Sequence, residues 1–225
     1  MPIRIAWFDI DGTLLRTGGA GSAAFEDAAR EVFKIPEGMK GICFAGRTDR
    51  SLVLEFFRRH GIPEREENIA RFYRVYLRRL AERLPRHRGG LCPGVKPFLD
   101  ALREQRPDLA LGLLTGNLRE GARLKLTHYG LWDRFSIGVF GDDHADRNEL
   151  GRQALEIARR ALGPDLAPPE MVVVGDTPAD VACGRSAGAK TLAVATGGAS
   201  LETLERARPD WSVEALTRAA LKWFA

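Results

Sequence analysis

The chain has 225 residues, of which 44% are hydrophobic, enough for one large domain or for a core domain that carries a smaller one. No segment approaches the roughly 20 apolar residues of a membrane span, and the N-terminus lacks the succession typical of a signal peptide, so no membrane partner is expected. The net charge of +4 would suit nucleic acid, but no recognition module accompanies it, so no nucleic-acid partner is expected either.

Short apolar segments alternate with helical patterns over most of the chain. The expected strands are 3–8, 109–115, 136–140, 171–175 and 190–196. The helical patterns between them lie near 94–105, 118–129, 147–162, 178–187 and 200–207. This alternation predicts an α/β fold in which helices cover both faces of a parallel sheet, a three-layer, Rossmann-like core. Ligands of such sheets bind beyond the carboxyl ends of the strands.

Residues 18–89 interrupt this alternation. They contain helical patterns near 20–34, 48–60 and 64–84 but no convincing strand, and glycine-rich segments flank them. We interpret 18–89 as a second, all-helical domain, inserted through a two-strand hinge into a core domain made of 1–17 and 90–225. The alternative is that these helices simply pack on the sheet.

The third helical pattern in this insert is rich in arginine, with apolar residues on its opposite face. We interpret it as an amphipathic helix with a solvated basic face. The alternative is a positive field that steers anionic substrates toward the protein.

Four carboxylates follow strands of the predicted sheet. Asp9 and Asp11 end the first strand, and Asp176 and Asp180 follow the fourth. Because parallel strands end at one edge of a sheet, these side chains should lie close together. Two like charges about 4 Å apart repel by about 4 kcal/mol at an effective dielectric constant near 20, so a cation is expected. Oxygen donors without a supporting His or Cys cluster favour Mg²⁺ over Zn²⁺.

A phosphate group would suit the same edge. Thr13 and Thr115 supply hydroxyls, while Gly12, Gly116 and Asn117 allow backbone N–H groups to approach an anion before a helix begins. Phosphoryl transfer calls for charge neutralisation, an in-line nucleophile and a proton donor for the leaving group. Two carboxylates two positions apart can divide this work, one as nucleophile and the other as acid and base.

These residues resemble a known superfamily. The segment FDIDGTLL (8–15) matches the DxDGT signature of haloacid dehalogenase-like hydrolases, LLTGN (113–117) looks like their second motif, and GDTPAD (175–180) looks like the fourth. Residues 18–89 occupy the place of that superfamily's helical cap. Within them, FAGRTDRSLVLEFFRRHGI (44–62) is closest to the phosphoglycolate phosphatase and β-phosphoglucomutase branch. The resemblance covers essentially the whole chain.

The resemblance implies a role for each matching residue. Asp9 would be the nucleophile that forms an aspartyl-phosphate, and Asp11 the general acid and base. Mg²⁺ would be held by Asp9, the main-chain carbonyl of Asp11 and Asp176, with Asp180 as a ligand or as an orienting residue. Thr115 would hold the transferring phosphoryl group, helped by backbone amides nearby. Dehalogenases of the superfamily lack the second aspartate, so its presence favours phosphoryl transfer.

The third motif of the superfamily is not matched. It usually contributes a lysine, whereas the corresponding segment here, GDDHADRNELGRQAL (141–155), contains none. We expect Arg147 to replace it, because arginine is always charged and offers several donors to phosphate. The alternative is a surface arginine that pairs with Asp143 or Asp146.

Arg47 is the expected contact between the cap and the substrate. It precedes a helical pattern in the insert, where Thr48 or Asp49 would cap the helix, and it is placed to reach a second phosphate or a carboxylate of the substrate. The alternative is a salt bridge within the cap. Arg16 and Lys34 are weaker candidates.

Together these observations predict a Mg²⁺-dependent phosphatase that acts on a small phosphorylated metabolite, such as phosphoglycolate or a sugar phosphate, through a covalent aspartyl-phosphate. A phosphosugar mutase of the β-phosphoglucomutase type is the alternative. A phospho-receiver signalling domain is a remote one, since such domains are about half this length and lack a helical insert.

The cysteines and aromatic residues bear on location and assembly. Cys43, Cys92 and Cys183 are odd in number and far apart, which is typical of reduced thiols and of a cytoplasmic protein. A monomer and a homodimer are both open, because four aromatic residues could be buried either in a dimer or in the core: Trp132, Trp211, Trp223 and Phe224.

Overall fold

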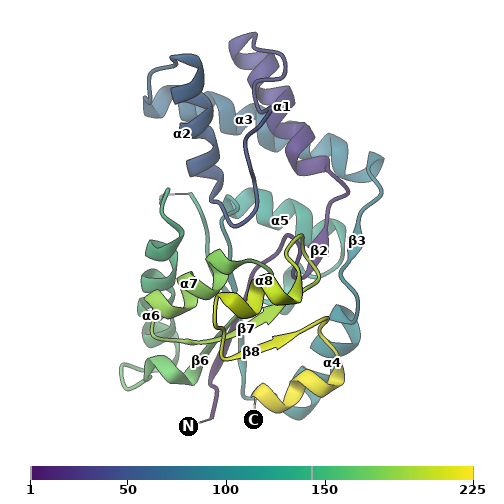
Figure 1. The fold of residues 1–225 in the computed structure, drawn as a ribbon, viewed down its shortest axis with the longest axis vertical. Helices are drawn as coiled ribbons and strands as arrows, with labels where there is room; N and C mark the ends of the chain where they lie inside the picture. Colours follow the sequence, from purple (N-terminus) through teal and green to yellow (C-terminus); the bar gives the residue numbers. More distant parts are fainter. Residues whose placement is uncertain (1, 143, 225) are drawn as a thin grey trace.

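The computed structural model describes residues 2–142 and 144–224, and it contains a six-stranded parallel sheet (Figure 1). The strand order is β5-β4-β1-β6-β7-β8, and every neighbouring pair runs parallel. The strands are β1 (Ile5–Phe8), β4 (Ala110–Leu114), β5 (Ile137–Val139), β6 (Met171–Gly175), β7 (Lys190–Val194) and β8 (Trp211–Val213). The first strand in sequence therefore lies in the interior of the sheet, between β4 and β6.

Helices cover both faces of this sheet, as the alternation predicts. They are α4 (Val95–Gln105), α5 (Arg119–His128), α6 (Arg147–Leu162), α7 (Pro178–Ser186) and α8 (Leu201–Arg206). Strand β1 is fully buried, and its alternate residues enter different cores: Phe8 packs with Phe98 of α4, whereas Trp7 packs with Leu150 of α6. Two buried faces explain why its sequence is apolar without interruption. The predicted three-layer α/β fold is confirmed.

The helical insert forms a separate layer above the carboxyl ends of the strands (Figure 1). Its helices are α1 (Ala20–Phe33), α2 (Asp49–His60) and α3 (Glu66–Arg83), and they share a core of their own that includes Phe25, Phe56 and Phe72. The boundaries at 17/18 and 89/90 stay a prediction.

The two crossings into the insert pair with each other, which the sequence did not predict. Strand β2 (Leu15–Arg16) and strand β3 (Gly90–Leu91) form a small antiparallel sheet in which Arg16 faces Gly90. Each strand has only two residues, too few for a recognisable alternation of apolar and polar residues.

The basic face of α3 packs against acidic residues of α1. Arg79 Nη2 lies 2.8 Å from Glu31 Oε2, and Arg83 Nε lies 2.5 Å from Asp27 Oδ2. Arg78 also pairs with Glu31. These arginines therefore join two helices of the insert, and their charge is partly compensated.

The C-terminal aromatic residues pack within the chain. Phe224 is fully buried and stacks on Phe8, with ring centroids 6.5 Å apart, and Trp211 stacks on Trp223 at 5.1 Å. Trp132 is partly buried against the same core. Within 2–142 and 144–224, no helix combines the length and apolar character needed to cross a membrane.

Candidate active site

Three buried carboxylates meet at the carboxyl edge of the sheet. Asp9 directly follows β1, Asp176 directly follows β6, and Asp180 lies in the first turn of α7. One oxygen from each lies within 4.8 Å of the others. Burial, and then the neighbouring carboxylates, raise the pKa values of Asp9 and Asp176 above the usual range of aspartate. The site thus concentrates negative charge where water is largely excluded.

Arg147 compensates part of this charge. It begins α6, is only 9% exposed, and places Nη2 3.0 Å from Asp9 Oδ1 and 2.5 Å from Asp180 Oδ1. Asp146 instead caps α6 by accepting a hydrogen bond from Asn148 N at 2.9 Å. Arg147 therefore lies inside the site rather than on the surface. Asp143, the other surface partner considered for it, lies outside the described residues.

Asp180 is held by the turn that begins α7. Its Oδ2 accepts hydrogen bonds from Thr177 N at 2.9 Å and from Thr177 Oγ1 at 2.6 Å, a capping box. Its Oδ1 faces Arg147. Asp180 thus has three donors and does not line the cavity described below.

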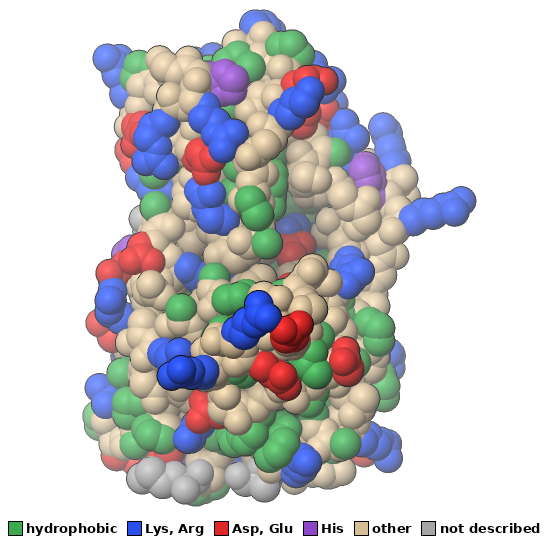
Figure 2. Space-filling model, in the orientation of Figure 1, with side chains coloured by type: hydrophobic (Ala, Val, Ile, Leu, Met, Phe, Trp, Pro, Cys, Tyr) green, Lys and Arg blue, Asp and Glu red, His purple; other side chains and the backbone are tan. Residues whose placement is uncertain are grey.

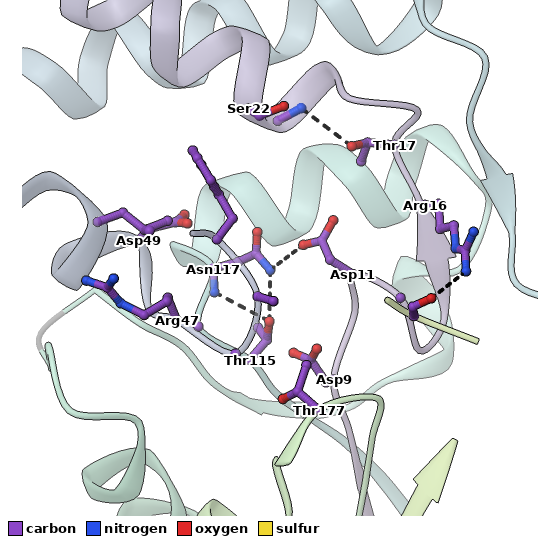
Figure 3. Close-up of a pocket in the computed structure, with 18 of the residues that line it drawn as sticks. Asp9, Asp11, Arg16, Thr17, Ser22, Arg47, Asp49, Thr115, Asn117 and Thr177 are labelled. Atoms are coloured by element: carbon purple, nitrogen blue, oxygen red, sulfur yellow. Dashed lines mark hydrogen bonds between the residues drawn. The ribbon is translucent and has the colours of Figure 1, made fainter. Parts of the chain in front are cut away.

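The side chain of Asp11 points away from the buried carboxylates (Figure 3). Its Oδ2 lies 2.5 Å from Lys125 Nζ and accepts a hydrogen bond from Asn117 Nδ2 at 2.9 Å. Asn117 Nδ2 also contacts Thr115 Oγ1 at 2.8 Å. Thr115 in turn hydrogen-bonds Asp9, which opposes the rise in the pKa of Asp9. A polar chain therefore links the two aspartates of the first motif.

Lys125 is a site residue that the sequence reasoning missed. It lies on α5, is 4% exposed, and also donates to Asn117 Oδ1 at 2.6 Å. A signal for it was present: Leu118, Ala122 and Leu126 mark the buried face of α5, and Lys125 occupies the i+7 position of that face. A lysine on an apolar helix face needs an acidic or polar partner inside the protein.

The predicted phosphate-binding loop residues take different positions. Gly12 adopts a φ of 87°, and a Cβ there would lie 2.4 Å from Asp176 Oδ2, so the turn requires glycine. Thr13 is fully buried and donates to Asp176 Oδ1 at 3.1 Å. Thr13 does not line the cavity, whereas Gly12, Thr115 and Gly116 do. In this structure Thr13 orients a carboxylate, and its role as a phosphate contact stays a prediction.

The insert docks onto the loop after β4. Asp49 N donates to Gly116 O at 2.7 Å, Leu118 N donates to Asp49 Oδ2 at 2.9 Å, and Thr48 Oγ1 donates to Ala145 O at 3.1 Å. Burial raises the pKa of Asp49 from the ordinary 3.8 to about 7. The start of α2 therefore closes directly over the second motif.

A cavity of about 500 Å³ lies between the insert and the sheet. Figure 2 shows the molecule hollowed between its upper and lower parts, with acidic and basic side chains inside the hollow. Asp9, Asp11 and Arg147 line the core side, while Phe25 and Tyr76 line the side of the insert.

Arg47 lines this cavity, but its guanidinium is already engaged. Nη1 lies 2.6 Å from Glu55 Oε2, Nε donates to Ser51 Oγ at 3.0 Å, and Nη2 donates to Ser51 O at 3.0 Å. This geometry matches the alternative of a salt bridge within the cap. Arg16 is similarly bonded to backbone carbonyls, including Gly197 O at 2.8 Å, and Lys34 donates to Glu31 O outside the cavity.

A parallel α/β sheet with an acidic cluster and a buried cation at its carboxyl edge, closed by a helical insert, defines a class of phosphoryl-transfer hydrolases. The chain belongs to the haloacid dehalogenase-like hydrolase family, whose model matches residues 6–194. The expected family and enzyme class are confirmed.

Individual proteins of known name are similar along nearly the whole chain. A phosphoglycolate phosphatase of Chromobacterium violaceum is 31% identical, over 90% of this chain and 89% of its own. The probable phosphatase IndB of Dickeya dadantii is 30% identical, over 92% of this chain and 87% of its own. In fold, a crystal structure described as a predicted phosphoglycolate phosphatase from Haemophilus somnus matches with a TM-score of 0.75 at 21% identity, over 99% and 98% of the two chains.

Proposed function

We propose that the protein is a Mg²⁺-dependent phosphatase that hydrolyses a small phosphorylated metabolite through a covalent phosphate on Asp9. The observation that best supports this proposal is that the two aspartates of the first motif have different environments. Asp9 lies buried beside Arg147 and Thr115, while Asp11 turns toward the cavity two residues later. A nucleophile and an acid–base group need these two different environments.

The donor set at the floor of the site fits Mg²⁺. Asp9, Asp176 and Asp180 offer only carboxylate oxygens, and within the described ranges Arg147 is the sole Lys or Arg that forms a salt bridge with any of them. Three carboxylates and one guanidinium leave an excess of negative charge, which a divalent cation could neutralise. Asp9, Asp176 and the main-chain carbonyl of Asp11 would hold it, with Asp180 as a further ligand or an orienting residue. When bound, Mg²⁺ would offset the charge of the phosphoryl oxygens.

The reaction proceeds in two displacements. A carboxylate oxygen of Asp9 attacks phosphorus, and the bond from phosphorus to the leaving oxygen breaks while Asp11 gives that oxygen a proton. Water then attacks the same phosphorus, Asp11 takes a proton from the water, and the bond between Asp9 and phosphorus breaks. Arg147 lies beside Asp9 and lines the cavity, so its positive charge can stabilise the negative charge that develops on the phosphoryl oxygens.

The cavity limits the substrate to a small molecule. A space of about 500 Å³ under the insert holds a phosphate group and a leaving group of metabolite size. Phosphoglycolate or a sugar phosphate is the proposed substrate class, and the name of the Chromobacterium relative supports the first. Arg47 would contact a second anionic group only after its bonds to Glu55 and Ser51 rearrange.

The test is phosphate release together with covalent labelling. Wild type, Asp9→Asn and the exposed control Asp165→Asn are incubated with Mg²⁺ and a panel that includes 2-phosphoglycolate, sugar phosphates and p-nitrophenyl phosphate. We expect release by wild type and by the control, and none by Asp9→Asn. Phosphate should remain on acid-quenched wild type but not on Asp9→Asn. Release that Asp9→Asn leaves unchanged would refute the proposal, and transfer of phosphate within a sugar without release would identify a mutase instead.

We also propose that the enzyme acts in the cytoplasm as a monomer or homodimer. All three cysteines, which lie within the described residues, are free thiols, and two of them are buried. Sedimentation measurements on the purified chain distinguish the two assembly states.

A further inference from the structure

Lys125 is a buried cation that the proposed two-step reaction does not yet use. Its side chain is 5% exposed, and both of its acceptors belong to loops at the carboxyl edge of the sheet, Asp11 after β1 and Asn117 after β4. A buried ammonium needs compensation by charge and hydrogen bonds, and among the described residues its hydrogen-bond acceptors are Asp11 and Asn117. The lysine therefore has a defined position relative to both loops.

Lys125 and Asn117 hold the same oxygen of Asp11. Oδ2 accepts from Lys125 Nζ at 2.5 Å and from Asn117 Nδ2 at 2.9 Å. Within the described part of the chain, Oδ1 of Asp11 has no hydrogen-bond partner. The Asp11 side chain is 43% exposed, and Asp11 lines the cavity. One oxygen is thus fixed to the protein, and the other is left for the substrate.

Lys125 also helps to orient the Asn117 amide. An ammonium group only donates, so it must face the amide oxygen, Oδ1. The amide nitrogen then faces Asp11 Oδ2 and Thr115 Oγ1, at 2.9 and 2.8 Å. Lys125 and Asp11 favour the same orientation, because a reversed amide would present its nitrogen to the ammonium group and its oxygen to the carboxylate.

We propose that Lys125 is a positioning residue for proton transfer: it fixes Asp11 Oδ2 directly, and again through Asn117, so that Asp11 Oδ1 faces the leaving oxygen of the substrate. This proposal rests on the proposed phosphatase function. A carboxyl group displaced by about 1 Å can lower a rate by about 100-fold, while general acid catalysis as a whole contributes about 10²- to 10⁴-fold.

The test compares two aryl esters that differ in their need for a proton. Nitrophenolate leaves readily without protonation, whereas phenolate is a poorer leaving group and gains more from an acid. For Lys125→Met, kcat/KM for phenyl phosphate should fall 10- to 100-fold more than kcat/KM for p-nitrophenyl phosphate, with KM changed less than threefold. Lys125→Arg should recover part of the loss, and the exposed control Lys96→Met should match wild type for both esters.

A double-mutant comparison tests whether the loss acts through Asp11, and Lys125→Arg, which keeps the buried charge, serves for the same ester comparison if Lys125→Met does not fold. In Asp11→Asn the carboxylate is gone, so adding Lys125→Met should cause no further selective loss with phenyl phosphate. Equal losses for the two esters in Lys125→Met, or the same selective loss in the Asp11→Asn background, would overturn the positioning role. Absence of phosphate release by wild type from both esters and from the phosphorylated metabolites of the panel would instead refute the proposed function, and this proposal with it.

Discussion

Arg147→Met tests the electrostatic design of the site most directly. The guanidinium is 9% exposed and contacts Asp9 Oδ1 at 3.0 Å and Asp180 Oδ1 at 2.5 Å. Its removal leaves a cluster of three buried carboxylates without the one cation that pairs with them in the described chain. Breaking a buried ion pair in this way costs about 3 to 5 kcal/mol.

This cost converts into a measurable change in melting temperature. For a chain of this size, each kcal/mol shifts Tm by about 2 to 4 °C, so we expect Arg147→Met to melt about 10 °C below wild type. The assay is thermal unfolding with EDTA at pH 9, above the raised pKa values of Asp9 (about 6) and Asp176 (about 8). Arg147→Lys keeps the charge at nearly the same place and should lose less than half as much.

Added Mg²⁺ separates electrostatics from packing. A cation that binds only the folded protein stabilises it, and it should stabilise Arg147→Met more than wild type because the variant has the larger uncompensated charge. A Tm for Arg147→Met within 2 °C of wild type in EDTA would refute the reasoning. So would a loss of the same size in Arg147→Lys, since that result would point to shape rather than charge.

Three further predictions concern the insert. Because the pKa of Asp49 is raised to about 7, the folded state keeps a proton that the unfolded state releases above about pH 4. The free energy of unfolding should therefore fall as the pH rises from about 4 to about 7. Asp49→Asn should remove up to about 4 kcal/mol of that fall, measured by urea titrations at pH 4 and pH 8. Gly116→Ala would place a Cβ 2.1 Å from Arg47 O, so α2 must withdraw, and KM should rise at least tenfold with an unchanged circular dichroism spectrum. Arg47→Met loses its pair with Glu55, so unfolding should cost about 1 kcal/mol less, while KM for 2-phosphoglycolate rises no more than KM for p-nitrophenyl phosphate.

The fold was predictable where local sequence carries the signal. Uninterrupted apolar segments such as β1 and β6 are buried on both faces, and the periodic helices need one buried face, so both leave a pattern in the sequence. Strand β8 was missed because it has three partly buried residues at the edge of the sheet. It is defined by pairing with β7 rather than by its own composition.

The residues of the site likewise divide into those whose place the local sequence indicates and those whose place depends on tertiary packing. Asp9 and Asp176 were predictable because strand ends converge in any parallel sheet, and Arg147 because it begins the helix after the third motif. The burial of Asp49 was not predictable, because it arises when α2 docks on a loop about 70 residues away in sequence. Lys125 could have been singled out from its place on the apolar face of α5, but its contacts with Asp11 and Asn117 depend on how α5 packs on the sheet.

The pairing of β2 with β3 has a consequence for how this fold can vary. Arg16 and Gly90 are direct partners, so the chain leaves the core and returns to it at adjacent points. The whole helical insert thus replaces what would otherwise be the tip of a short hairpin, a place where insertions are tolerated best. A lineage could lengthen, shorten or exchange this segment without changing any crossover of the six-stranded sheet. The carboxyl edge of the sheet and the helical insert can therefore evolve at different rates within one continuous chain.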